Sequence, residues 1–181
     1  MMHASSRDKG KKDISFFLEL KGMHIFFSLD LITLNLKSKE KNEIIKEMVG
    51  LFVKSDKIKD ANIFYKRLLS REQLDSTAIG QNVALPYTFC STKEDIVVAV
   101  AILRKGIDFD SLDGEPVKII FMSAHNKKTD GNQEEKAQYH LYWLARLSRF
   151  LKDSEKRELL IRAKSKEEVF RILKENFKNE R

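Results

Sequence analysis

The sequence predicts an α/β fold in which a layered sheet is covered by helices on both faces. Segments with strand-like alternation take turns along the chain with segments whose apolar residues recur at helical spacing. Two segments, DIVVAVAIL (residues 95–103) and VKIIFM (residues 117–122), are rich in β-branched residues, as in buried strands. Only seven Gly and two Pro occur in 181 residues, which disfavours disorder and a turn-dense all-β fold.

The first half of the chain predicts two strands and two helices. Residues 31–36 (LITLNL) alternate and predict a strand, and Ser38 is expected to cap the following helix. Asp60 is expected to cap a second, shorter helix. Residues 80–85 predict a short strand that stops at Pro86, because proline has no N–H to donate to a ladder. The expected inward residues of the two helices are Ile44, Ile45, Met48, Leu51, Phe52, Phe64, Leu68 and Leu69.

The second half predicts two buried strands followed by helices. Residues 95–103 are expected to form a central strand, and Asp113-Gly114 a turn before the strand at 117–122. Residues 125–135 are polar and predict a long exposed loop. A long helix follows, with its expected apolar side at Ala137, Leu141, Leu144, Leu147 and Leu151.

Two further helices complete the predicted order. Residues 153–163 predict the first of them, and Ser165 to Glu168 have the spacing of a capping box at the start of the last. The stripe of that last helix is Val169, Ile172, Leu173 and Phe177.

The N-terminal residues, the longest apolar run and the single cysteine predict the domain organisation and the cellular compartment. Residues 1–22 do not share the later pattern and are expected to be an N-terminal extension, with one domain at 23–181 and Met23 as a candidate natural start. The longest apolar run, residues 96–103, is far shorter than the roughly 18 residues of a spanning helix, and we expect no signal peptide. Cys90 is the only cysteine, which favours a reducing, cytoplasmic location.

The net charge of +7 admits a nucleic-acid or acidic protein partner. However, 34 positive and 27 negative side chains are interleaved along most of the chain, as on an ordinary solvated surface. No zinc-finger spacing or aromatic RNA-binding signature occurs. Nucleic-acid binding therefore stays an alternative rather than the main hypothesis.

Three stretches resemble the enzyme IIA domain of the bacterial phosphotransferase system, in its fructose, mannitol and nitrogen-regulatory class. They are LSREQLDSTAIGQNVALPY (residues 69–87), FDSLDGEPVKIIFMSA (residues 109–124) and HLYWLARLSRFLKDSEKRELLIRAKSKEEVFRIL (residues 140–173). The stretches follow the family's order, and the resemblance covers about residues 24–177.

The resemblance implies a three-layer α/β sandwich with a mixed sheet. It also implies a phosphoryl relay: such a domain accepts a phosphoryl group from a small phosphocarrier protein onto a histidine, then passes it to a downstream sugar-transport domain. Nitrogen-regulatory members instead sense phosphorylation and bind regulatory targets. The partners implied are therefore a carrier protein of the system or a regulatory protein. Nothing in the resemblance implies a cofactor.

In this class the acceptor histidine directly follows the proline that ends the ALP-like strand. Here that position is Tyr87. A neutral imidazole is a nucleophile near pH 7 and its phosphorus–nitrogen bond is labile, whereas a phenol has a pKa near 10 and forms a stable ester. The resemblance therefore implies a replaced acceptor. Tyr87 is either a neutral replacement in an inactive site, which we favour, or a new catalytic tyrosine.

Two other positions match the family's active site. Arg71 stands where the family has an arginine that pairs with phosphate through a bidentate guanidinium, and His140 matches the second histidine, which hydrogen-bonds the phosphoryl group. The alternatives are a surface arginine and a packed or capping histidine.

Cys90 and His125 are candidate substitute acceptors. A thiol needs a lowered pKa to act, and a semi-buried structural cysteine is the simpler interpretation. His125 is placed by the sequence on an exposed loop. No histidine pair has metal-ligand spacing, and no glycine-rich phosphate loop is found.

The sequence therefore favours a IIA-like protein that lacks the acceptor histidine and works as a regulatory or protein-interaction module. The first alternative is an active phosphocarrier that uses His140, His125 or Cys90. The second is a nucleic-acid binder.

Overall fold

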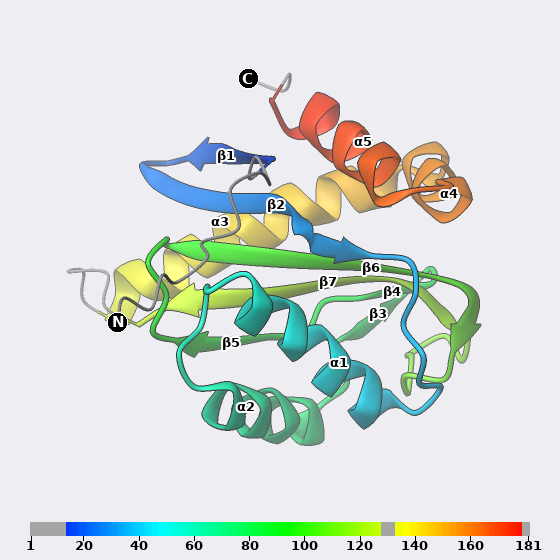
Figure 1. Cartoon of the computed structure of the whole chain (residues 1–181), viewed down its shortest axis with the longest axis horizontal. Helices are drawn as coiled ribbons and strands as arrows, with labels where there is room; N and C mark the ends of the chain where they lie inside the picture. Colours follow the sequence, from blue (N-terminus) through cyan, green and yellow to red (C-terminus); the bar gives the residue numbers. More distant parts are fainter. Residues whose placement is uncertain (1–13, 128–132, 179–181) are drawn as a thin grey trace, which may run out of the picture.

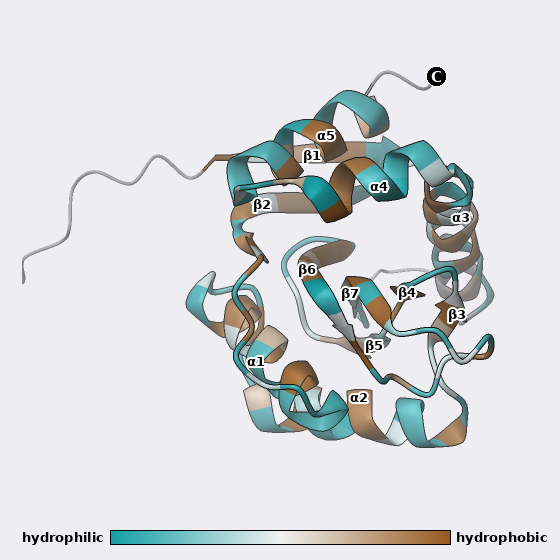
Figure 2. Ribbon diagram, turned by 90° about the vertical axis from the view of Figure 1, so that its right-hand side faces the viewer, coloured by the Kyte–Doolittle hydropathy of each residue, from teal (hydrophilic) through white to brown (hydrophobic). Residues whose placement is uncertain are grey.

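The computed structural model describes residues 14–127 and 133–178 and places a mixed sheet between two layers of helices (Figures 1 and 2). The strands lie in the order β1-β2-β6-β7-β4-β3, and β5 also pairs with β7. Neighbours are antiparallel except β2/β6, β4/β7 and β5/β7, which are parallel. The predicted three-layer sandwich is confirmed. The elements are β1 (Ser15–Leu20), β2 (Met23–Thr33), α1 (Lys41–Lys54), α2 (Ala61–Leu74), β3 (Ala78–Gly80), β4 (Val83–Ala84), β5 (Tyr87–Cys90), β6 (Ile96–Ile107), β7 (Val117–Asn126), α3 (Gln133–Lys152), α4 (Ser154–Arg162) and α5 (Lys166–Lys178).

Each face of the sheet has its own apolar core. Helices α1 and α2 cover one face, and α3, α4 and α5 cover the other (Figure 2). Residues 96–103 of β6 are all apolar because both faces of this part of the strand are covered: Val98 and Val100 face the α3 side, while Val97 and Ala99 face the α1 side. A central strand buried on both faces needs this continuous pattern. The predicted central position of this strand is confirmed.

Part of the expected N-terminal extension lies in the sheet. Strand β1 pairs with β2, and the ring of Phe16 stacks on Phe27 with centroids 4.8 Å apart. Phe16 and Leu18 are buried in the core on the α3 side. Residues 1–13 lie outside the described part of the chain, so the domain boundary at residue 23 stays a prediction.

Two details at the start of the domain differ from the sequence expectation. The first predicted strand, 31–36, is the end of the longer β2, whose pairing with β6 stops at Thr33. Leu34 to Leu36 have already left the sheet. Ser38 does not cap α1, which begins after Glu40; instead its N–H donates to the Glu47 carboxylate at 2.8 Å. The cap predicted at Asp60 is confirmed, because its side chain accepts from the Ile63 N–H.

The strand predicted at 80–85 is a hairpin instead. β3 ends at Gly80, and Gln81 and Asn82 have φ values of 55° and 65°, as in a two-residue turn with left-handed backbone. β4 then returns and Pro86 interrupts it, but the chain resumes as β5 at Tyr87. The prediction missed the turn because neither turn residue is glycine.

The loop predicted at 125–135 is also wrong at both ends. β7 continues to Asn126, and α3 begins at Gln133. Residues 128–132 lie outside the described part of the chain. The expected face of α3 is rotated, since Leu141 is 61% exposed and Ala137 is exposed. The buried residues of α3 are His140, Trp143, Arg146, Leu147, Phe150 and Leu151. The predicted stripe of α5 is confirmed, since Val169, Ile172, Leu173 and Phe177 are all buried.

None of the described helices combines the length and the apolar character that crossing a membrane would need.

Candidate functional site

Strand β5 carries a small ring cluster at its edge of the sheet. Tyr87 is its first residue, directly after the buried Pro86. Side chains alternate along a strand, so Tyr87 and Phe89 project to one face. In the pairing with β7, Tyr87 lies opposite Ser123 and Phe89 opposite His125. Helix α3 packs over this face and places His140 against it.

The rings of this cluster are in close contact. The centroids of Tyr87 and His140 are 4.0 Å apart with planes inclined by 30°. His125 lies edge-on to His140 at 4.8 Å and to Tyr87 at 5.8 Å. Phe89 is 5.4 Å from His125. Tyr87 of β5, His125 of β7 and His140 of α3, all candidates from the sequence, therefore lie in one cluster, which we call the Tyr87 pocket.

Arg71 reaches the same pocket from α2. Its Nε donates to the Tyr87 hydroxyl at 3.4 Å, and its guanidinium carbon lies 5.2 Å from the centre of that ring. Its Nη1 also donates to the carbonyl of Asp75 at 3.0 Å, and this bond holds the guanidinium group just past the end of α2. A planar cation held beside a hydroxyl is well suited to bind an oxyanion.

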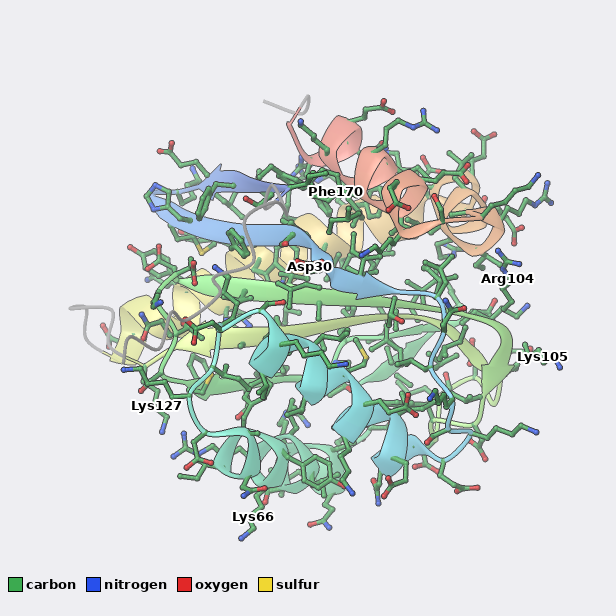
Figure 3. All side chains as sticks on the ribbon, viewed as in Figure 1. Asp30, Lys66, Arg104, Lys105, Lys127 and Phe170 are labelled. Carbon is green, nitrogen blue, oxygen red and sulfur yellow. The ribbon has the colours of Figure 1, made fainter. Side chains whose placement is uncertain are left out.

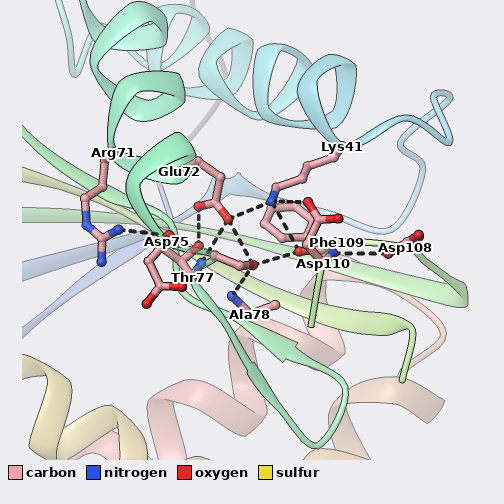
Figure 4. A network of polar contacts seen from close by, with 10 residues as sticks. Lys41, Arg71, Glu72, Asp75, Thr77, Ala78, Asp108, Phe109 and Asp110 are labelled. Carbon is pink, nitrogen blue, oxygen red and sulfur yellow. Dashed lines mark hydrogen bonds and ion pairs between the residues drawn. The ribbon is translucent and has the colours of Figure 1, made fainter. Parts of the chain in front are cut away.

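A buried polar network holds the end of α2 in place (Figure 4). The Glu72 carboxylate accepts from the Thr77 N–H at 2.9 Å and from the Thr77 hydroxyl at 2.6 Å. Lys41 of α1 contacts Glu72 at 3.0 Å and Asp110 at 2.9 Å. Burial opposes the charge on Lys41, but hydrogen bonds to Asp110 and Glu72 outweigh it and raise its pKa. The network tethers the turn of α2 that carries Arg71.

Both histidines of the cluster are held neutral. Burial, and secondarily the charge of Arg71, lower the pKa of His140 to about 4. Its Nδ1 is buried and has no hydrogen-bond partner within the described residues. Burial, and secondarily His140, lower the pKa of His125 well below its usual value. The Nε2 of His125 lies 2.9 Å from the Ser123 hydroxyl. At pH 7 the pocket therefore has Arg71 as its cation and two neutral imidazoles.

Cys90 lies on the other side of the sheet. Alternation along β5 turns it away from Tyr87, into the core on the α1 side. Burial raises the pKa of its thiol to about 11, despite the positive charges of Arg67 and Lys127. The structure therefore brings together Tyr87, Arg71, His140 and His125, and separates Cys90 from them.

The contribution of β7 to the site was not predicted from the sequence. His125 was expected on an exposed loop, but it is only 3% exposed and lies within β7. A signal was present, because Phe121, Ser123 and His125 stand at every second position and would share one face if the strand continued past its predicted end at Met122. The strand was predicted to end at Met122 because polar residues follow it. Among residues 14–127 and 133–178, no three His, Cys, Asp or Glu side chains are grouped to hold a metal ion.

A family model described as "Phosphoenolpyruvate-dependent sugar phosphotransferase system, EIIA 2" matches residues 25–176. The chain belongs to this family. The EIIA 2 match spans both helical layers and every strand except β1.

Known EIIA 2 relatives come from sugar transport and from nitrogen regulation. The fructose-specific EIIABC component of Bacillus subtilis (strain 168) is 34% identical over 147 residues, which are 81% of this chain and 22% of that protein. The chain thus spans about a fifth of that three-component relative. The crystal structure of nitrogen regulatory protein IIA-Ntr from Neisseria meningitidis has a TM-score of 0.69 and 28% identity, over 80% of this chain and 94% of that one.

A third neighbour is enzyme IIA mannitol of Escherichia coli, solved in complex with phosphorylated enzyme IIB mannitol. Its TM-score is 0.64 at 19% identity, over 82% of this chain and 97% of that chain. At this identity the comparison shows a shared fold alone.

Proposed function

We propose that this EIIA 2 protein has lost the phosphoacceptor and acts as a regulatory or protein-interaction module. The observation that carries the proposal is the side chain at the head of β5. Tyr87 occupies the position that the family resemblance assigns to the acceptor, inside a pocket that retains Arg71 and His140. A phenol with a pKa near 10 is rarely ionised at pH 7, and its phosphate ester is a poor donor.

The pocket around Tyr87 supports recognition rather than relay. The Tyr87 ring is half-buried and contacts both the guanidinium of Arg71 and the ring of His140. These contacts hold the side chain in one orientation, so that its surface is pre-formed for a partner. We propose that the partner is a carrier protein of the phosphotransferase system or a regulatory protein, in the cytoplasm. A protein of the same fold, E. coli enzyme IIA mannitol, has been solved in such an assembly with its phosphorylated IIB partner.

The competing function is an active phosphocarrier that uses another acceptor, and one observation favours His140 in that role. His140 is a neutral imidazole whose Nδ1 is unbonded within the described residues, and these are properties that a phosphoacceptor needs. Against this, the side chain is 9% exposed and the ring of Tyr87 lies across it. His125 is more deeply buried and contacts Ser123, and Cys90 is a buried thiol of raised pKa. These features favour Tyr87 as an inactive acceptor position.

Phosphoryl transfer itself distinguishes the two functions. The purified protein is incubated with the general phosphotransferase enzyme, the histidine phosphocarrier and phosphoenolpyruvate labelled with phosphorus-32. We expect label on the carrier and none on this protein. Acid-labile label on this protein would overturn the proposal.

If such label appears, three single substitutions identify the acceptor: His140→Ala, His125→Ala and Cys90→Ala. The competing function requires one of them to abolish labelling, and His140→Ala is the first candidate. Circular dichroism of each variant checks that the fold is retained.

A further inference from the structure

A second surface feature lies at the opposite end of β6 from the ring cluster. It is a groove of about 1090 Å³ lined by residues 32–39, by residues 102–108 and by residues 164–166. Strand β6 links the two places, since its first residue, Ile96, pairs with His125 and its other end borders the groove. Nothing in the Tyr87 pocket contributes to the groove. We call it the β6 groove.

The β6 groove is strongly basic. Its lining has a single carboxylate, Asp108, and six cations: Lys37, Lys39, Arg104, Lys105, Lys164 and Lys166. Arg104 donates to the carbonyl of Ala163, and Lys166 lies 3.7 Å from Asp30. The other four ammonium groups form no ion pair within the described residues, and all four residues are exposed. The carboxylates of Glu47 and Glu168 accept from the backbone N–H groups of Lys37 and Lys164 and offset part of this charge. The excess of positive charge in one concavity focuses a potential that attracts an anionic partner.

The floor of the β6 groove is an incompletely paired strand. β2 leaves the sheet after Thr33, whose partner is Ala101, but β6 continues to Ile107. On the other side, the pairing with β7 is interrupted between Ile102 and Ile107. Gly106 lies in that interval with φ +68°, and a Cβ there would come 2.8 Å from Pro116. Among the described residues, positions 102–106 of β6 therefore have no β2 partner, and they line the groove.

We propose that the β6 groove docks an extended, acidic segment of a partner protein along the free edge of β6. An added strand hydrogen-bonds to the edge through its backbone, while its carboxylates meet the ring of cations. Leu34 and Leu36, both half-buried, offer apolar contact between the charges.

A nucleic acid suits this groove less well. Single-stranded nucleic acids are held by stacking on aromatic side chains as well as by cations. Among the residues that line the groove there is no Phe, Tyr, Trp or His. The backbone edge, in contrast, offers both N–H and C=O groups, which an added peptide strand can pair with. The observations therefore favour an acidic peptide segment over a nucleic acid.

Fluorescence anisotropy with a labelled peptide tests the proposal on the whole protein. The probe is a 12-residue peptide of alternating Glu and Val, and a peptide of alternating Gln and Val is the neutral control. We expect binding of the acidic probe alone, weakening steeply as salt is raised from about 50 to 300 mM, within which the Debye length falls below 10 Å. Failure of the acidic probe to bind at 50 mM salt would overturn the proposal.

Two double variants with the same charge change locate the site. Lys39→Glu with Lys105→Glu alters exposed groove lysines, and Lys66→Glu with Lys174→Glu alters exposed lysines elsewhere (Figure 3 shows Lys105 and Lys66 on separate parts of the surface). We expect at least a tenfold loss of affinity from the groove variant and less than a twofold change from the control. Equal losses would mean nonspecific charge attraction and would contradict the docking site. Thermal melts confirm that both variants fold.

Two further probes test the occupant. An acidic peptide N-methylated at alternate residues cannot pair along a strand edge, and we expect it to bind at least tenfold more weakly. Unchanged binding of that peptide would overturn strand addition. A single-stranded 12-nucleotide DNA that binds more tightly than the acidic peptide, and loses affinity in the groove variant, would overturn the peptide in favour of a nucleic acid.

Discussion

The ring of Tyr87 lies against the ring of His140, with centroids 4.0 Å apart and planes inclined by 30°. Tyr87 comes from the edge strand β5 and His140 from α3, so the contact joins the sheet to its helical cover. Each ring removes the other from water. The contact therefore keeps the imidazole neutral and the phenol in a single orientation.

The neutral histidines predict loss of stability in mild acid. The pKa of His140 is lowered to about 4, and that of His125 lies well below its usual value. Unfolded histidine titrates near pH 6.5, so between pH 6.5 and 4 the unfolded chain binds more protons than the folded one. The free energy of unfolding should fall with falling pH, by up to about 1.4 kcal/mol per pH unit for each histidine. Urea unfolding at a series of pH values measures this slope.

The variant His140→Gln measures how much His140 contributes to the pH dependence of the free energy of unfolding. Removing one titrating group should reduce the pH dependence between pH 6.5 and 5, whatever the variant does to stability at pH 7. An unchanged slope in His140→Gln, or a flat wild-type profile, would contradict the assignment.

Restoring a histidine at the head of β5 tests whether the remaining pocket still supports transfer. We expect Tyr87→His to take up acid-labile phosphate from the labelled carrier, at least tenfold above the wild-type protein, because Arg71 and His140 are already in place. The matched variant Tyr87→Phe should stay unlabelled. If Tyr87→His is also inert while it is folded, the pocket has lost more than its acceptor.

The buried thiol predicts slow alkylation. A rise in the pKa of Cys90 from 9.0 to about 11 lowers the thiolate fraction at pH 7.5 about a hundredfold, and burial also restricts access. Iodoacetamide should therefore react with the native protein at least a hundredfold more slowly than with the protein in urea. Mass spectrometry follows the reaction, and rapid native alkylation would show an accessible thiolate instead.

The network beneath Arg71 predicts a costly substitution at Glu72. In Glu72→Gln one carboxylate oxygen is replaced by an NH₂ group, so the side chain can no longer accept from both the N–H and the hydroxyl of Thr77 as it does now. The negative charge that pairs with Lys41 is also removed. We expect the free energy of unfolding to fall by about 2–4 kcal/mol. The exposed Glu43→Gln, whose partner Lys46 is 3.7 Å away, should cost under about 0.5 kcal/mol. Urea denaturation compares the two, and similar losses would contradict the structural role of Glu72.

Two glycines should respond to alanine with opposite signs. Gly80 has φ +85°, and a Cβ there would lie 2.9 Å from the Asp113 carboxylate, so Gly80→Ala should destabilise by about 1–2 kcal/mol. Gly50 lies inside α1 with nothing within 4 Å of an added Cβ, so Gly50→Ala should stabilise by up to about 1 kcal/mol. Thermal melts give both values, and a destabilised Gly50→Ala would mean that crowding there has been missed.

The layers of the fold can be predicted from sequence patterns alone. The continuous apolar run of β6 indicates a strand buried on both faces, and the apolar stripe of α5 indicates a helix buried on one face. Both patterns are visible in the sequence as hydrophobic periodicity. The motif stretches also named Tyr87, Arg71 and His140, and the structure places these three in one pocket.

The surroundings of those residues depend on long-range packing, which sequence patterns do not contain. Periodicity carries no information about long-range pairing, so the register that sets Phe89 opposite His125 could not be read from either strand alone. The same holds for the separation of Cys90 from Tyr87, since the pleat and the packing of α2 and α3 decide which face is which. The β6 groove likewise arises because β2 departs from its neighbour after Thr33, and its charge comes from three segments far apart in the chain.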